Sequence, residues 1–259
     1  MLQPHTKDSQ ECVQNGKATA GRSTKFGAYY SFYFRPTAEI LHSYLLYCSS
    51  TMISLRAKGS AEPELFRLHQ ALLCHFSSYY HSAINGPFEE KGKDTFEIDA
   101  DKETLRLLSA WIYTGRLYSP YDRELVDLYI FADKFDIIAL RRAVMTEMQG
   151  WPEELPLDLV EIAVENLPST SPFLLWLLDD YIERWEAHRE MPEEMSEGAL
   201  KEFLWKVVRG QALRRFAREN NFPEEYRRGL CDYHEHESKE EHDASKIPNE
   251  SKVASHVGG

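Results

Sequence analysis

The chain of 259 residues is 42% hydrophobic and 12% aromatic, which is enough apolar material for one large or two modest folded domains. Its net charge of −12 is uneven: residues 1–150 contain 17 Lys/Arg and 18 Asp/Glu, whereas residues 151–259 contain 13 and 24. An acidic second half repels phosphate and argues against nucleic-acid binding. This acidity reflects either well-solvated helices or selection of a basic partner.

Cysteine usage and hydropathy point to an intracellular protein. The four cysteines are scattered, which argues against a disulfide scaffold and fits a reducing compartment. The polar first residues lack the apolar core of a signal peptide. The most apolar run, Pro172 to Ile182, is shorter than the ~20 residues of a membrane span. We therefore expect a location in the cytoplasm and/or nucleus, with no membrane partner.

In chain order, residues 1–35 lack periodicity and predict a disordered leader. A helical apolar face then runs from Ile40 to Cys48. The alternation of apolar and polar residues next predicts three short strands: Met52–Leu55, Leu65–Leu68 and Thr95–Ile98. Between the second and third strands, two helical stretches are expected at Gln70–Cys74 and Ser77–Asn85.

The rest of the chain has a helical period. Three helices are predicted around Leu105–Ile112, Leu125–Ala132 and Ile137–Met148, the first of them ending at Gly115 as a C-terminal cap. Beyond Pro152, helices are expected at Leu159–Asn166, Phe173–Trp185 and Leu200–Glu219. Residues 234–259 are charged and rich in Ser and Lys, and they predict a disordered acidic tail.

A series of short motifs follows these elements in a fixed order. The series is Leu68-His69-Gln70, Ala71-Leu72-Leu73-Cys74, Ser77-Ser78-Tyr79-Tyr80, Phe88-Glu89-Glu90, Trp111-Ile112-Tyr113-Thr114-Gly115, Ala132-Asp133-Lys134-Phe135 and Ala139-Leu140-Arg141. In combination it resembles the BTB (POZ) domain, especially the versions common in fungal proteins. The resemblance implies an α+β fold: a small sheet flanked by helices at residues 36–148, including the N-terminal helix, followed by an all-helical extension at 149–233.

The resemblance also implies a partner. BTB adaptors of cullin ubiquitin ligases carry a hydrophobic-x-Glu motif in the loop before the last strand, and Phe88 and Glu90 match it. Phe135 matches an aromatic position that lines the same contact. An exposed aromatic anchor beside a carboxylate suits a partner pocket. The alternative is that Phe88 and Phe135 pack within their own domain and the glutamates are solvated.

Other candidate residues have structural interpretations. The resemblance implies that His69 is a structural histidine that helps to anchor the chain between strand and helix. Many BTB domains dimerise through a charged pair, an Asp before the first strand and a basic residue after the His. Here these positions are Ser50 or Thr51 and Gln70, so the charged pair is missing. A homodimer formed in another way is still possible. The segment Cys231–His236 offers one thiolate and two imidazoles without a second ligand pair, so a solvated terminus is favoured over a zinc site.

No catalytic, cofactor-binding or metal-binding constellation is visible in the sequence, so we expect no enzyme activity. BTB domains bind other proteins. The preferred function is a substrate adaptor of a cullin-type ubiquitin ligase, with the extension widening that interface or recruiting the target. The alternative is a self-associating or transcription-linked BTB scaffold with no ubiquitin role; without a zinc-finger pattern, direct reading of DNA is not expected.

Overall fold

A computed structural model describes residues 51–58, 64–88, 92–119, 121–149, 154–185, 198–220, 228, 230–236 and 239. The predicted leader, the predicted helix at Ile40–Cys48 and residues 240–259 lie outside this described part.

Three short strands form one sheet in the order β2-β1-β3. The central strand β1 (Met52–Ala57) pairs antiparallel with β2 (Leu65–His69) and parallel with β3 (Thr95–Ile98). Apolar side chains alternate along the strands as predicted, so Ile53, Leu55 and Phe96 are buried on one face. The three predicted strands are therefore confirmed.

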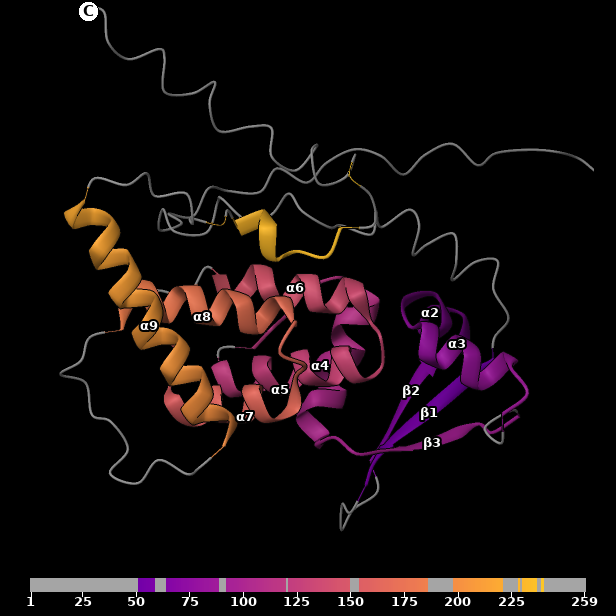
Figure 1. Cartoon of the computed structure of the whole chain (residues 1–259). Coiled ribbons are helices and arrows are strands. Elements are labelled where there is room, and N and C mark those ends of the chain that lie inside the picture. The colour runs from indigo at the N-terminus through magenta and orange to yellow at the C-terminus, as the bar shows by residue number, and fades with distance from the viewer. Residues whose placement is uncertain are drawn as a thin grey trace, which may run out of the picture. The chain divides into compact units, whose positions relative to one another are not determined.

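In the described part of the chain, the sheet is accompanied by five helices: α2 (Gln70–Phe76), α3 (Ser78–Asn85), α4 (Lys102–Thr114), α5 (Asp122–Lys134) and α6 (Ile138–Gln149) (Figure 1). Helix α4 illustrates why the sequence folds this way. Asp101 caps its first turn by accepting a hydrogen bond from the Thr104 amide at 2.6 Å. The helix ends at Gly115, whose left-handed φ of 64° confirms the predicted glycine cap.

The described residues of the extension form α7 (Leu157–Asn166), α8 (Pro172–Arg184), α9 (Ala199–Glu219) and the short 3-10 helix η1 (Leu230–Tyr233). Pro172 occupies the first turn of α8, where its missing amide hydrogen costs nothing. Helix α7 contacts α5, and α9 contacts both α7 and α8 (Figure 1). The predicted helical extension is confirmed, with bounds within a few residues of those expected.

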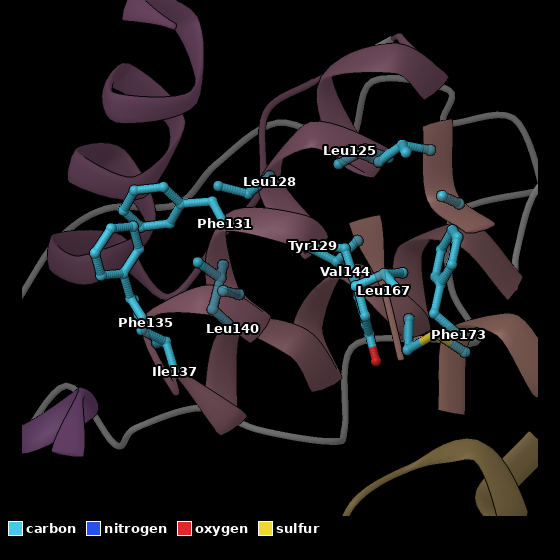
Figure 2. Close-up of a cluster of buried hydrophobic side chains, with 14 of the residues drawn as sticks. Leu125, Leu128, Tyr129, Phe131, Phe135, Ile137, Leu140, Val144, Leu167 and Phe173 are labelled. Carbon is cyan, nitrogen blue, oxygen red and sulfur yellow. The ribbon is translucent and has the colours of Figure 1, made fainter. Parts of the chain in front are cut away.

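One hydrophobic core runs through the sheet-bearing part and the extension. Figure 2 shows a cluster of side chains from this core, with Phe131 and Phe135 on one side of the cluster, Phe173 of α8 on the other, and Tyr129 and Val144 among the side chains between them. The rings of Tyr129 and Phe173 are 4.7 Å apart. Because α7 and α8 contribute to the same core, the extension packs on α5 through apolar contact.

The last described residues return to α6 and α8. Arg141 of α6, with a side chain only 9% exposed, donates two hydrogen bonds to Glu235, from Nε at 2.5 Å and Nη2 at 2.7 Å. Tyr233 donates to Asp179 of α8 at 2.8 Å. His234 lies 3.3 Å from the Thr146 hydroxyl. Residues 234–236 were predicted to begin the disordered tail, whereas the structure places them against α6.

None of the helices in the described ranges is both long enough and apolar enough to span a membrane.

Candidate functional site

Helix α3 and the residues that follow it carry the predicted partner-binding motif. Ser77 fixes the start of this helix. Its hydroxyl accepts a hydrogen bond from the Tyr80 amide at 3.1 Å and donates one to the Phe135 carbonyl at 2.6 Å. A second bond joins Ser78 to Asp136. Helix α3 is thereby anchored at its N-terminus to the turn between α5 and α6.

Phe88 is the exposed anchor of the site. Its side chain is 55% exposed, and it lies three residues beyond the end of α3. The ring rests on Gly86: a Cβ added there would lie 2.9 Å from Cδ2 and 3.0 Å from Cε2 of Phe88 and would also clash with the Ser82 carbonyl. Gly86 therefore provides a flat seat for one side of the ring and leaves the other side accessible to solvent.

Glu90 and its neighbour Glu89 lie outside the described residues, so the carboxylate half of the predicted motif has no geometry here.

Phe135, the third predicted contact residue, is a core side chain only 5% exposed. Its ring stacks on Tyr80 at 5.4 Å, with an interplanar angle of 14°, and lies 4.5 Å from Phe131. The edge of Tyr79 covers it at 5.2 Å. Because Phe135 is almost fully buried and Tyr79 packs against its ring, we expect a partner to contact Tyr79 rather than Phe135.

Tyr79 is a residue that sequence reasoning did not single out. It is 44% exposed, whereas its neighbour Tyr80 is fully buried. Residues seven apart on a helix fall on nearly the same side, so Tyr79 and Gly86, the seat of Phe88, share one side of α3. The Ser-x-Tyr-Tyr pattern contained this signal, because adjacent helical residues point about 100° apart and only one of the two tyrosines can face the core.

Charged groups border the Tyr79 end of this surface. The Lys134 ammonium lies 5.8 Å from the Phe135 ring centroid and 3.6 Å from Asp99. Asp133 and Asp136 face Arg141 at 3.4 and 3.7 Å. Burial raises the pKa of the Asp133 carboxyl, an effect that the Arg141 charge opposes. The site thus combines exposed aromatic rings with a rim of mixed charge, which suits a protein partner.

His69 has the structural role expected of it. Its backbone amide donates to the Tyr113 hydroxyl at 3.1 Å, and its ring Nδ1 lies 2.9 Å from the same oxygen. The two rings meet edge to face at 5.8 Å. His69 therefore links the end of β2 to α4, and burial raises the pKa of Tyr113.

Thr51 and Gln70, at the positions of the charged pair used for dimerisation, are neighbours in the structure. The backbone N–H of Gln70 donates to the Thr51 carbonyl at 3.0 Å. Neither side chain carries a charge, so these two positions supply no ion pair.

The described residues contain no group of three or more His, Cys, Asp or Glu side chains that could hold a metal ion. The imidazoles of His234 and His236 have centroids 6.1 Å apart. His234 is half-buried, and burial is the main reason that its pKa is lowered to about 4, with the His236 and Arg142 charges adding to the effect. The side chain of His234 therefore packs against Thr146 and His236.

Comparison with known protein families gives a match for one part of the molecule. Residues 53–150 match the family model of the BTB/POZ domain, a span that runs from β1 to the end of α6 and covers less than half of the chain. No curated protein matches the sequence. The fold is thus a BTB domain, with its three-stranded sheet flanked by helices, followed by a helical C-terminal region. BTB domains are protein-interaction domains.

Proposed function

We propose that this protein is a non-enzymatic adaptor that links a target protein to a cullin-type ubiquitin ligase. The observation that carries the proposal is the exposure of Phe88, at 55%, at the motif position predicted to bind the scaffold. Of the two interpretations of Phe88, anchor or core residue, this exposure supports the first.

The physical argument concerns preorganisation. An aromatic side chain has only two rotatable side-chain bonds, so it loses little conformational freedom on binding, and its large apolar area is suited to a partner pocket. Phe88 rests on Gly86, and the backbone N–H of Gly86 donates a hydrogen bond to the Ser82 carbonyl of α3 at 2.7 Å. Tyr79 extends the aromatic surface, and Glu90 would add an oriented carboxylate at the rim.

The helical region from α7 to η1 would widen this interface or recruit the target. The proposed place of action is the cytoplasm or nucleus. The likeness to BTB domains of fungal proteins is part of the same proposal.

The test is binding of the full-length protein to a purified cullin N-terminal domain, measured by calorimetry and pull-down. Phe88→Ala should weaken binding at least about tenfold, as removal of an aromatic anchor does. Tyr118→Ala is the matched control, because Tyr118 is 56% exposed in the loop after α4. It should bind like the wild type.

The stability of the variant separates the two interpretations of Phe88. As a surface change, Phe88→Ala should alter the free energy of unfolding by less than about 1 kcal/mol. A loss of about 3–5 kcal/mol would identify a core residue and contradict the proposal.

Two further variants locate the contact. Glu90→Gln should weaken binding less than Phe88→Ala, because it keeps the shape and removes only the charge. Phe135→Leu, which retains apolar volume in the core, should leave binding near that of the wild type. A folded wild type that binds no cullin would favour the alternative, a self-associating BTB scaffold.

A further inference from the structure

Helix α9 carries two apolar stripes, of which the fold buries one. The inner stripe packs on α7 and α8 and consists of Leu200, Phe203, Leu204 and Val207. The outer stripe comprises large apolar side chains that are exposed: Trp205 at 67%, Val208 at 45%, Leu213 at 60% and Phe216 at 58%. A surface helix ordinarily turns charged residues outward, so this second stripe is unexpected.

The outer stripe is continuous along the helix. Trp205, Val208, Ala212 and Phe216 are spaced three, four and four residues apart, which places them on one side of a helix, with Leu213 beside them. This side is opposite to the buried stripe. Scattered single apolar residues are normal on a surface, whereas a contiguous apolar patch on a soluble domain marks an interaction site.

The geometry of α9 presents this stripe to solvent. At Gly210 the helix lies close to α8, because a Cβ there would lie 2.7 Å from Ile182 Cγ1. One residue later Gln211 donates to the Trp185 carbonyl at 2.7 Å. Residues 212–219 are then all exposed or half-buried, and this end of α9 extends past α8 (Figure 1).

Charge selects the kind of partner. Helix α9 contains six Lys/Arg and two Glu, so it is basic. Residues 151–259 contain 13 Lys/Arg and 24 Asp/Glu in all, and the part of this half outside α9 is therefore strongly acidic. Lys206 and Arg209 are exposed next to Trp205 and Val208.

Two other occupants fit these charges poorly. In a two-fold dimer the same patch meets itself, which would bring two basic helices together. An anionic membrane would attract α9 and repel the acidic remainder of the molecule. An acidic helical segment is short enough to face the basic side chains of α9 alone, so it gains from them and meets less of this repulsion than an extended membrane surface does.

We propose that the outer stripe of α9 binds an acidic amphipathic helix of a partner protein. The apolar side chains of that helix would pack on Trp205, Leu213 and Phe216, and its carboxylates would face Lys206 and Arg209. This site is separate from the Phe88 site and does not depend on cullin binding.

The test uses the full-length protein and labelled synthetic peptides of about 20 residues, the length of α9. The probe is an acidic peptide of Glu, Ala and Leu with leucines at helical spacing i, i+3, i+4 and i+7. A peptide of the same composition in shuffled order tests the need for an apolar face, and a third with Lys in place of Glu tests the need for acidity. Binding is measured by fluorescence anisotropy.

The acidic amphipathic peptide should bind saturably, and the other two should bind at least about tenfold more weakly. Trp205→Ala and Phe216→Ala should each weaken binding by a similar factor, and Lys206→Glu with Arg209→Glu should do so most strongly at low salt. Tyr121→Ala, which truncates an aromatic that is 62% exposed elsewhere, and Phe88→Ala should have no effect.

Circular dichroism of each variant confirms that it is folded. The proposal is overturned if the peptide does not bind, or if it binds equally well to the Trp205 and Phe216 variants. It is also overturned if the outer stripe instead mediates dimerisation in sedimentation equilibrium, or binds vesicles of phosphatidylcholine and phosphatidylserine in preference to the peptide. Phe88→Ala is expected to leave peptide binding unchanged. Failure of this proposal is therefore distinct from failure of the cullin proposal.

Discussion

The BTB domain and the helical extension bury their apolar residues in one core, yet they are held together differently. In the BTB domain, neighbouring elements interlock through aromatic stacking, as where Tyr80 lies between Phe96 and Phe135 at 5.7 and 5.4 Å. In the extension, α9 packs closely on α8 where Gly210 faces Ile182. The ion pair between Arg141 and Glu235 joins the C-terminal segment to α6. The aromatic contacts involve no charged group, whereas the ion pairs of the C-terminal segment also respond to charge and pH.

The largest effect is expected from truncation on either side of the shared core. Tyr80→Ala and Phe173→Ala should each lower the free energy of unfolding by about 3–5 kcal/mol, because both side chains are fully buried aromatics. If the core is common to both parts, each variant should still unfold in a single transition by chemical denaturation. Two separate transitions would show that the extension folds independently.

A conservative variant sharpens this prediction. Among the residues that the structure describes, the buried Tyr80 hydroxyl has no hydrogen-bond partner. Tyr80→Phe should therefore leave stability unchanged or raise it slightly, because it removes a polar group that burial has desolvated. A substantial loss of stability would mean that the hydroxyl has a role that its surroundings do not suggest.

The second largest effect concerns Arg141. Arg141→Met should cost about 2–3 kcal/mol, because it leaves Glu235, Asp133 and Asp136 without the cation that lies among them. Glu235→Gln should cost about 1 kcal/mol, since Arg141 keeps the two aspartates and Glu235 is already 31% exposed. A double-mutant cycle of the two changes measures their coupling, and additive effects would contradict a direct pair.

A smaller effect is expected at the α8–α9 crossing. Gly210→Ala gains about 1 kcal/mol in helix propensity but forces a methyl group into Ile182, so the net result should be a loss of about 1 kcal/mol. In an Ile182→Ala background the same change should become stabilising. Thermal unfolding of the four proteins checks this reversal of sign.

The smallest expected effect is the pH dependence of the C-terminal segment. His234 has its pKa lowered to about 4, so the packed state disfavours protonation, while an unpacked histidine titrates near 6.5. Stability from this group is complete above about pH 6.5, falls as the pH decreases toward 4, and is lost below it. The raised pKa of Asp133 acts in the opposite direction at the acidic end of this range.

Hydrogen exchange of residues 230–236 should therefore be faster at pH 5 than at pH 7, after correction for the intrinsic rate. His234→Gln should remove most of this difference. Equal protection of the wild type at both values would contradict the packed environment of His234.

Local pattern was sufficient to predict most of the helices and strands, whereas the BTB fold was predicted from the resemblance of the motif series to that family. Alternation identified β1 and β3, and the left-handed glycine cap at Gly115 was correctly placed. The interpretation of His69 was also correct, although its partner Tyr113 was not foreseen, because the two are 44 residues apart. Periodicity describes neighbours along the chain and carries little information on such distant contacts.

The candidate site was harder to predict for the same reason. A motif can place Phe88 in a loop, but its exposure depends on how the ring sits on Gly86. The burial of Phe135 depends on Tyr79, Tyr80 and Phe131. The ordering of residues 234–236 depends on Arg141, which lies 94 residues before Glu235. Their charged composition alone is typical of a disordered tail.

The parallel pairing of β1 with β3 has a consequence for how the molecule forms. Arg56 and Glu97 lie opposite each other although they are 41 residues apart, so β2, α2 and α3 must be traversed before this edge can close. Contacts between consecutive helices such as α5 and α6 close much shorter loops. We expect the helical layers to assemble first and the β1–β3 edge to join late. Until then, one side of Met52–Ala57 offers unpaired backbone groups to other chains, so aggregation during synthesis should begin at this strand.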